Sequence, residues 1–367
     1  MSAAEAPLQP SVQRRLVGLA CSAEVRRRYV DDADLARLAP VADFSHRAFS
    51  VASDLSGPAP RDAGAEAELA EFAAGLDVLV VCHGAPFVSA EILACTPRLS
   101  MLGELDGDRF GYRLDLAAAQ EQGVRVVDTT HGSSWPTAEW ALALALIGLR
   151  NAGALFRRMI AHEPSVPHAL RSGPGYAGAE LSKKRIGMIG FGHIARSLVG
   201  LLKPFDVEVR AFDPFAPREL AEAYDVVFGR LESILECDVV FVLVPHTPAT
   251  EGMLGVAELD RLRTGSVLVN VSRGKVIDTA ALLARLARGD VIACLDVFEP
   301  EPVPLDSPVL DLPNVFLTPH IAGYTEESRR RFFSLMVDEC LRHFAGFEPW
   351  AQLTPTNVRR SPARAQP

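Results

Sequence analysis

The stretch from Arg185 to Pro214 constrains the fold of this chain more than any other. It reads RIGMIGFGHIARSLVGLLKPFDVEVRAFDP: an apolar run, a glycine turn, an amphipathic segment and a second apolar run. Gly190 and Gly192 permit a tight turn and a close approach of the backbone to a pyrophosphate, whose charge is stabilised by the N-terminus of a helix beginning at His193. Asp213 ends the second apolar run, where a carboxylate can bind the hydroxyls of an adenosine ribose. The stretch therefore predicts a strand, turn, helix and strand that bind a dinucleotide.

The end of this unit also predicts which dinucleotide is bound. Ala195 takes the third small position of the motif, where helix and strand pack closely. Asp213 would repel a ribose 2′-phosphate, so we expect NAD rather than NADP as the cofactor. The alternative is a glycine turn that serves packing alone, which the flanking strands and the terminal acid disfavour.

Length and composition limit the remaining possibilities. With 367 residues, the chain is long enough for two domains with separate cores. Its formal net charge of −9 gives no general attraction to nucleic acid or to an anionic membrane surface. The longest helical apolar run, at 140–149, is shorter than the ~20 residues that a membrane span needs. The six cysteines form no C-x-x-C pair, so we expect reduced thiols in a cytoplasmic protein and no metal site.

Strand and helix signals alternate along the chain, which is typical of α/β domains with parallel sheets. We expect residues 1–10 and 355–367 to be flexible, and an extended loop at 162–178. A helix at 137–150, with Thr137 or Ser134 as its N-cap, could join two domains. The predicted strands of the first domain are 16–20, 41–44, 77–82, 99–102 and 124–127, and its helices are 32–38, 63–74, 89–95 and 114–122. After 185–189 and 207–212, the predicted elements are strands 238–244, 266–271, 291–295 and 314–317, helix 278–288 closed by Gly289, and helix 325–344, which returns to the first domain.

Three stretches of the second domain place polar side chains directly after predicted strands. They contain Arg273, the carboxylates Asp296, Glu299 and Glu301, and His320. Ligands of open α/β sheets bind at the carboxyl ends of the strands, and a guanidinium can hold a carboxylate by two parallel hydrogen bonds. Each residue taken singly has a structural alternative: a surface ion pair, a solvated carboxylate or a structural histidine. Their convergence on one sheet favours a catalytic site.

These residues also carry a resemblance. The segments GFGHIA, DP, VPHTP, NVSRG, LDVFEPEP and TPHIAG, in this order, resemble the D-isomer-specific 2-hydroxyacid dehydrogenase family, over about residues 99–323. The resemblance implies an α/β fold of two Rossmann-like, doubly wound domains. An NAD-binding domain, 135–321, would be inserted in a flavodoxin-like substrate domain, 1–134 and 322–367, with a cleft between them. It further implies a homodimer.

The resemblance also implies roles for individual residues. Arg273 would bind the carboxylate and carbonyl of a 2-oxo acid, His320 would be the general acid and base, and Glu301 would orient and charge it. Asp296 would lie beside the nicotinamide. Glu301 is preferred to Glu299 because the family's glutamate follows the aspartate by five residues. The full set of implied cofactor contacts is Gly190, Gly192, His193, Ile194, Asp213, Thr247, Val271, Arg273, Asp296, His320 and Gly323.

The chain departs from the family pattern on the substrate side. Residues 103–115 replace a shorter glycine-rich loop, and 131–136 contain an unusual Ser-Ser-Trp-Pro. Arg109 could bind a second anionic group or pair with Asp106 or Asp108. The leading hypothesis is therefore an NAD-dependent oxidoreductase that interconverts a 2-hydroxy and a 2-oxo acid whose identity the sequence leaves open. The alternatives are a non-catalytic, NAD-sensing protein that binds partners, as corepressors of this family do, and an NAD-dependent enzyme that oxidises a small anion such as phosphite.

Overall fold

The computed structural model describes residues 14–52, 60–107, 111, 113–163 and 178–353. The described residues of Met1–Thr130 and Arg329–Thr354 form one compact unit, and those of His131–Ser328 form a second. We predicted boundaries at 134/135 and 321/322, and the assignment of substrate binding to the first unit stays a prediction. The ends that we expected to be flexible, 1–10 and 355–367, lie outside the described residues, as does most of the loop expected at 162–178.

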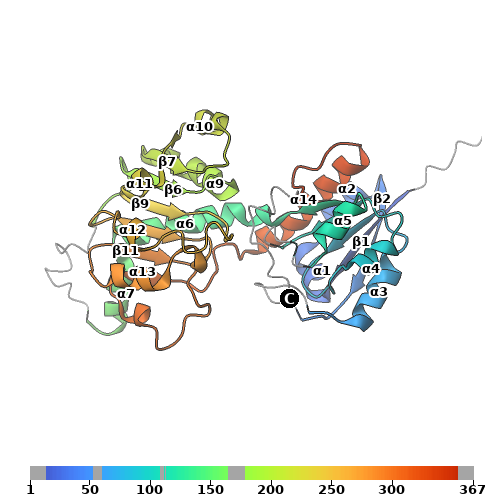
Figure 1. Cartoon of the computed structure of the whole chain (residues 1–367), viewed down its shortest axis with the longest axis horizontal. Coiled ribbons are helices and arrows are strands. Elements are labelled where there is room, and N and C mark those ends of the chain that lie inside the picture. The colour runs from blue at the N-terminus through green and yellow to red at the C-terminus, as the bar shows by residue number, and fades with distance from the viewer. Residues whose placement is uncertain (1–13, 53–59, 108–110, 112, 164–177, 354–367) are drawn as a thin grey trace, which may run out of the picture. The chain divides into compact units, whose positions relative to one another are not determined.

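The first unit is built on a five-stranded parallel sheet with the order β2-β1-β3-β4-β5 (Figure 1). This order places the chain's change of direction between β1 and β3, the switch point at which such sheets bind ligands. The strands are β1 (Arg15–Cys21), β2 (Ala42–Ala48), β3 (Val78–Val81), β4 (Met101–Glu104) and β5 (Arg125–Asp128). The helices are α1 (Ala23–Tyr29), α2 (Asp32–Leu38), α3 (Ala63–Ala73), α4 (Ala90–Ala94) and α5 (Leu116–Glu121).

Helix α14 (Glu326–Phe344) completes the core of the first unit from the far end of the sequence. Phe332, Phe333 and Met336 are almost fully buried in one core with strand residues of β1, β3 and β4. A Cβ atom on Gly103 would lie 2.5 Å from the sulfur of Met336, so the helix packs directly on the strand backbone there. The amphipathic pattern of the helix predicts this burial, since one face is apolar and the other charged.

The second unit contains a seven-stranded parallel sheet with the order β12-β11-β10-β9-β6-β7-β8 (Figure 1). The strands are β6 (Arg185–Ile189), β7 (Glu208–Phe212), β8 (Val227–Phe228), β9 (Val239–Val242), β10 (Val267–Asn270), β11 (Ile292–Leu295) and β12 (Val315–Leu317). The sequence predicted six strands, and this count was wrong. The missed strand, β8, has two residues and is too short to show any periodicity.

Helices pack on both faces of this sheet. Along β9, Val239 and Phe241 belong to one core and Val240 and Val242 to the other, which explains why the strands read as continuous apolar runs. The α-helices of this unit are α6 (Ser134–Leu149), α7 (Ala152–Ile160), α9 (His193–Leu202), α10 (Arg218–Tyr224), α11 (Leu231–Leu235), α12 (Val256–Leu259) and α13 (Thr279–Leu286). The short 3₁₀ segments of the chain are η1 (Thr130–Ser133), η2 (Lys203–Phe205), η3 (Gly274–Val276) and η4 (Pro308–Asp311).

The caps predicted for two helices were wrong. Helix α6 begins at Ser134, after Ser133, whose side chain makes no capping hydrogen bond, and the Thr137 hydroxyl donates to the Ser133 carbonyl at 2.8 Å. The earlier start is possible because proline is tolerated in the first turn of a helix, where Pro136 lies. Helix α13 ends at Leu286, with Gly289 in the left-handed conformation beyond the cap. In the described part of the chain, no single helix has the length and hydropathy of a membrane span.

Candidate active site

Three neighbouring strands of the second unit carry the predicted catalytic residues. Strand β11 lies between β10 and β12, and both pairings are parallel. Arg273 follows β10, Glu301 lies in the segment after β11, and His320 follows β12. Because the carboxyl ends of parallel strands meet at one edge of a sheet, the fold brings these three segments to the edge where ligands bind.

His320 and Glu301 are in direct contact. The distance between His320 Nδ1 and Glu301 Oε1 is 3.0 Å, and both side chains are 39% exposed. His320 has a left-handed backbone, with φ of 53°, and its amide donates to the Asp296 carbonyl at 2.8 Å. The backbone carbonyl of Glu299, two residues before Glu301, accepts a hydrogen bond from the Thr279 hydroxyl at 3.0 Å. The geometry therefore pairs His320 with Glu301, and leaves the imidazole Nε2 for another partner.

Asp296 holds the backbone on either side of this histidine. Its carboxylate is 1% exposed and accepts the Thr318 hydroxyl at 2.5 Å and the amides of Ile321 and Ala322 at 3.0 and 2.9 Å. Trp140 of α6 adds a hydrogen bond from its indole to the Thr318 hydroxyl, 3.3 Å long. The sequence indicated only a carboxylate beside the nicotinamide. Its contacts with the next loop depend on the pairing of β11 with β12, which no local pattern encodes.

The turn that carries Arg273 is built by Asn270. Its side-chain oxygen accepts from the amide and hydroxyl of Ser272 at 3.0 and 2.9 Å, and its nitrogen donates to the Arg273 carbonyl at 3.1 Å. A Cβ atom on Gly274 would lie 2.2 Å from the Phe298 carbonyl, so only glycine lets this turn pack against the loop after β11. The Arg273 guanidinium is half-buried and donates to the Ser272 carbonyl at 2.6 Å.

The glycine turn after β6 has the features that a pyrophosphate needs. Gly190 has φ of +96°, and a Cβ atom there would lie 2.9 to 3.0 Å from Leu243 and Val244. Around Gly192 no atom lies within 4 Å of the position of a Cβ, and no side chain caps the first turn of α9. The space beside Gly192 at this helix end can admit an anion, so the turn fits the cofactor that the sequence predicts.

Asp213 is positioned by three backbone amides. Its Oδ2 accepts from Phe191 at 2.9 Å, and its Oδ1 accepts from Phe215 at 2.8 Å and from Ala216 at 3.1 Å. A carboxylate has about four acceptor positions, so it can still accept from a ribose hydroxyl. The hydrogen bond to Phe191 ties the end of β7 to the glycine turn, which places the carboxylate beside the predicted pyrophosphate position.

The other predicted cofactor residues lie in the same unit. The His193 ring is 4.9 Å from the His131 ring, centroid to centroid, at the start of α9. The Thr247 hydroxyl is 3.0 Å from that of Thr250, and Thr247 is almost fully buried. Ile194 is half-buried, Val271 is buried, and Gly323 packs near Ser133. Their contacts with a cofactor stay predictions.

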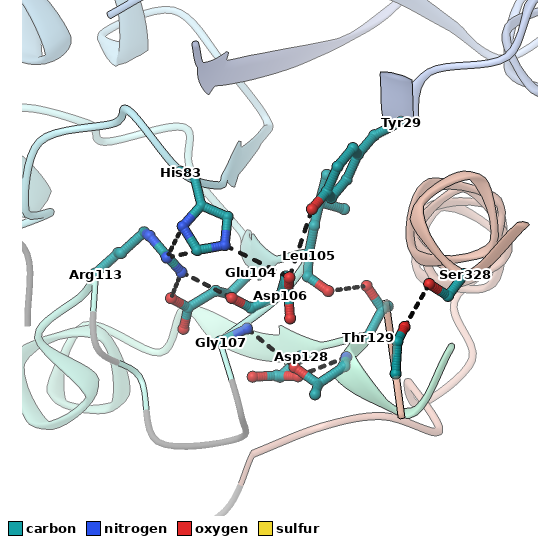
Figure 2. Close-up of polar contacts among 12 residues, drawn as sticks. Tyr29, His83, Glu104, Leu105, Asp106, Gly107, Arg113, Asp128, Thr129 and Ser328 are labelled. Carbon is teal, nitrogen blue, oxygen red and sulfur yellow. Dashed lines mark hydrogen bonds and ion pairs between the residues drawn. The ribbon is translucent and has the colours of Figure 1, made fainter. Parts of the chain in front are cut away.

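A second polar cluster, which the sequence analysis missed, lies in the first unit. Figure 2 shows His83, Glu104, Asp106 and Arg113 pointing toward one another. His83 follows β3, and Glu104 is the last residue of β4. The signal in the sequence was a charged residue, Glu104, at the end of an apolar strand. Its partner, Arg113, lies nine residues later in the same charged stretch, 103–115, which shows no periodicity. Arg109, in that stretch, lies outside the described residues.

Cys294 and Cys340 lie in the cores of the second and first units, respectively. Burial raises the pKa of Cys294 and of Cys340 to about 12, so both thiols are protonated at neutral pH. In the described ranges, no group of three or more histidine, cysteine, aspartate or glutamate side chains is arranged to hold a metal ion.

Comparison with known proteins identifies the second unit. Residues 142–322 match the family model described as D-isomer specific 2-hydroxyacid dehydrogenase, NAD binding domain. The chain is 32% identical to a D-3-phosphoglycerate dehydrogenase of Archaeoglobus fulgidus over 272 residues, which are 73% of this chain and 49% of that protein. It is 29% identical to a glyoxylate reductase of Korarchaeum cryptofilum over 283 residues, 76% of this chain and 82% of that protein.

A solved structure gives the same fold. The NAD-complexed D-isomer specific 2-hydroxyacid dehydrogenase of Lactobacillus delbrueckii ssp. bulgaricus superposes with a TM-score of 0.73 and 20% identity, covering 92% of this chain and all of that one. The chain spans about half the length of the phosphoglycerate dehydrogenases to which it is similar. On the family model, the sequence relatives and the fold, the chain belongs to the D-isomer specific 2-hydroxyacid dehydrogenase family, with an NAD-binding domain within its second unit.

Proposed function

We propose that the protein is an NAD-dependent oxidoreductase that interconverts a D-2-hydroxy acid and a 2-oxo acid. The observation that carries this proposal is the contact of 3.0 Å between His320 and Glu301, at the edge of the NAD-binding sheet that also carries Arg273. Family relatives named for dehydrogenase and reductase activities support it. The pair supplies a proton donor, and the arginine supplies a site for a carboxylate.

Each residue has a distinct task in this proposal. The bound cofactor would supply the hydride for the carbonyl carbon. Arg273 binds the substrate carboxylate and stabilises the negative charge that grows on the carbonyl oxygen. His320 holds its transferable proton at Nε2 and donates it to that oxygen, because Nδ1 is occupied by Glu301. Glu301 stabilises the protonated ring and fixes its orientation.

The test is a measurement of NADH oxidation with a panel of 2-oxo acids, followed by chiral analysis of the products. We expect turnover of at least one acid, with a D-2-hydroxy acid as product. If none is turned over although NADH binds, the protein is better described as an NAD sensor that binds partners. Oxidation of phosphite, and of no 2-hydroxy acid, would support the third hypothesis of the sequence analysis.

The first prediction concerns the preference for NAD. Replacing Asp213 by alanine should reduce the ratio of kcat/KM with NADH to that with NADPH, chiefly by weakening NADH binding, because the acceptor for the ribose hydroxyls is lost. Both values are obtained from initial rates at saturating 2-oxo acid. Asp206→Ala, at another residue of the same unit, is the control and should leave the ratio unchanged. Equal wild-type values with the two cofactors would contradict the role of Asp213.

The second prediction concerns Glu301. Glu301→Gln keeps the shape of the side chain and removes the charge that stabilises protonated His320, so kcat/KM for reduction should begin to fall at lower pH than in the wild type. The measurement is the pH profile of reduction under conditions in which chemistry limits the rate. Glu299→Gln is a matched control two residues away and should leave the profile in place. The reverse result would make Glu299 the partner of His320.

We also propose a homodimer, which an exposed apolar face on helix α7 supports. Phe156, Met159 and Ile160 are 62%, 58% and 62% exposed, and their spacing puts them on one side of the helix. Exposed apolar patches are typical of protein interfaces, and those of C₂ homodimers are self-complementary.

The third prediction tests this interface. Phe156→Asp should shift the sedimentation coefficient from that of a dimer to that of a monomer, because the charge would be buried in the contact. Phe215→Asp, at a residue with 57% exposure elsewhere on the same unit, is the control and should remain dimeric. A wild-type monomer at micromolar concentration would contradict the proposal.

Two broader assignments complete the proposal. The first unit is assigned to substrate binding, since the carboxyl edge of its sheet has a switch point and a polar cluster. A cytoplasmic location is supported by the free state of all six cysteines, five of which are buried, because unpaired thiols persist in a reducing compartment.

A further inference from the structure

The segment that carries His320 is held by side chains outside the proposed catalytic residues. Thr318, two residues before the histidine, donates its hydroxyl to Asp296 Oδ1 at 2.5 Å. The same hydroxyl accepts a hydrogen bond of 3.3 Å from the Trp140 indole of α6. An indole nitrogen can only donate, so the hydroxyl proton of Thr318 is directed to Asp296. Thr318 therefore joins helix α6 to the residue that follows β11.

Asp296 passes this constraint to both sides of the histidine. Its carboxylate is almost fully buried, and it also accepts from the amides of Ile321 at 3.0 Å and Ala322 at 2.9 Å. The His320 amide donates to the backbone carbonyls of Asp296 at 2.8 Å and of Thr318 at 3.0 Å. A buried carboxylate requires its hydrogen bonds, because each one that is lost leaves its charge less compensated. The backbone around His320 is therefore fixed to one carboxylate.

The backbone between Thr318 and His320 is also stiff. Pro319 fixes its own φ and restricts Thr318 to extended conformations. His320 has a left-handed backbone, with φ of 53°, and such a conformation persists where the surrounding contacts determine it. A displacement of Thr318 therefore moves the histidine instead of being absorbed between the two residues.

We propose that Thr318 and Trp140 are positioning residues, which hold the His320 ring in its contact with Glu301. This inference rests on the proposed function. Neither side chain has to touch the substrate, because the indole orients the Thr318 hydroxyl and the hydroxyl fixes Asp296. Without the hydroxyl, the carboxylate of Asp296 loses a hydrogen bond, and the contact of 3.0 Å between His320 and Glu301 loosens.

The test replaces Thr318 by valine, which keeps the branched shape and removes the hydroxyl. Thr318→Val should lower kcat for reduction of the best 2-oxo acid of the panel by about 10- to 100-fold, as expected when a catalytic group is misplaced. NADH binding, measured by fluorescence titration, should be nearly unchanged. Thr318→Ser keeps the hydroxyl and should restore most of kcat. Trp140→Phe should cause a smaller loss, because the hydroxyl still reaches Asp296.

A matched control lies at the opposite edge of the same sheet. Thr264 precedes β10 and donates its hydroxyl to Asp290 Oδ2 at 3.0 Å, so Thr264→Val also removes a hydrogen bond from a hydroxyl to a carboxylate. Its kcat should equal that of the wild type.

The pH profile separates positioning from a general loss of stability. In Thr318→Val, kcat/KM for reduction should begin to fall at lower pH than in the wild type, whereas Thr264→Val should leave the profile in place. Combined with Glu301→Gln, Thr318→Val should cause no further shift, because the charge that it positions is already absent. Thermal unfolding shows whether each variant is folded, and Trp140→Phe takes the place of Thr318→Val if the valine variant is not.

Nuclear magnetic resonance provides a measurement that does not require turnover. The ring nitrogen signals of His320, assigned by their absence in His320→Asn, should change at constant pH in Thr318→Val and not in Thr264→Val. Unchanged ring signals and an unshifted pH profile in the folded variant would overturn the inference and leave the proposed function intact, and so would a serine variant as impaired as the valine variant. Absence of turnover by the wild type with every acid of the panel would overturn the proposed function, while the ring signals would still decide whether Thr318 positions His320.

Discussion

Replacing His320 by asparagine is expected to lower kcat for reduction of the 2-oxo acid by about 10²- to 10⁴-fold, the range by which a positioned general acid accelerates a reaction. Asparagine is the appropriate substitute because it tolerates the left-handed backbone of this position, where φ is 53°. NADH binding, measured by fluorescence titration, should be retained, since the glycine turn and Asp213 are unchanged. The loss would then lie in proton transfer.

A matched control is available for this variant. His162 follows α7 and also has a left-handed backbone, with φ of 60°, so His162→Asn makes the same substitution in the same conformation. Its rates should equal those of the wild type. If His320→Asn retained wild-type kcat with chemistry limiting the rate, another group would have to supply the proton, and the assignment of the His320 and Glu301 pair would be wrong.

Replacing Arg113 by methionine is expected to reduce the free energy of unfolding by about 3–5 kcal/mol at pH 8, because it leaves the buried carboxylate of Glu104 without its cation. Arg47→Met is the control: Arg47 pairs with Glu68 at 2.8 Å, close to the 2.9 Å of Arg113 and Glu104, but both partners are more than 40% exposed. Its loss should cost at most about 1 kcal/mol. Urea denaturation, followed by circular dichroism, gives both values.

The cost of the Arg113 variant should depend on pH. Burial raises the pKa of Glu104 from its ordinary value of 4.5 to about 7, with the charge of Asp128 adding to the effect and Arg113 opposing it. The folded state therefore favours neutral Glu104, and the resulting stabilisation is complete below pH 4.5 and is lost as the pH rises through 7. Without Arg113 the carboxyl is still harder to ionise, so the variant should lose more stability at pH 8 than at pH 6.

A second substitution distinguishes an unpaired charge from a simple packing defect. Adding Glu104→Leu to Arg113→Met removes the orphaned carboxylate, and replacement of a buried ion pair by apolar groups is often close to neutral. The double variant should therefore recover most of the lost stability and lose the pH dependence. A double variant as unstable as Arg113→Met alone would show that the guanidinium acts through packing and its other contacts, with the Asp106 carbonyl and His83.

Much of the second unit followed from its sequence because its signals are local. The two strands and the helix around Gly190 are contiguous, and each of the later strands β9 to β12 is a short apolar run that pairs in parallel with its neighbours. A residue that directly follows such a strand must lie at the carboxyl edge of the sheet. Spacing therefore placed Arg273, His320 and the carboxylates after β11 at one edge, and the resemblance to the family selected Glu301 among those carboxylates.

Several short elements were missed. Helix α1 contains a run of three arginines, Arg26 to Arg28, which obscures its buried face. Helix α7 was missed although the spacing of its apolar residues puts them on one side. Strand β8 pairs with β7 through two residues only. Such short elements form because the neighbouring strand and helices are already in place.

The sequence by itself determined the alternation of strands and helices, the dinucleotide-binding turn and the edge that carries the candidate catalytic residues, because contiguous residues encode each of these. Only the tertiary structure decided which polar side chains meet. The carboxylate of Asp296, which follows β11, accepts from the Ala322 amide in the segment after β12. Arg113 pairs with Glu104 at the end of β4 and with His83 after β3. The cost of burying a charge forces such pairs to form, but their partners are set by how the strands pair, which is a property of the folded sheet.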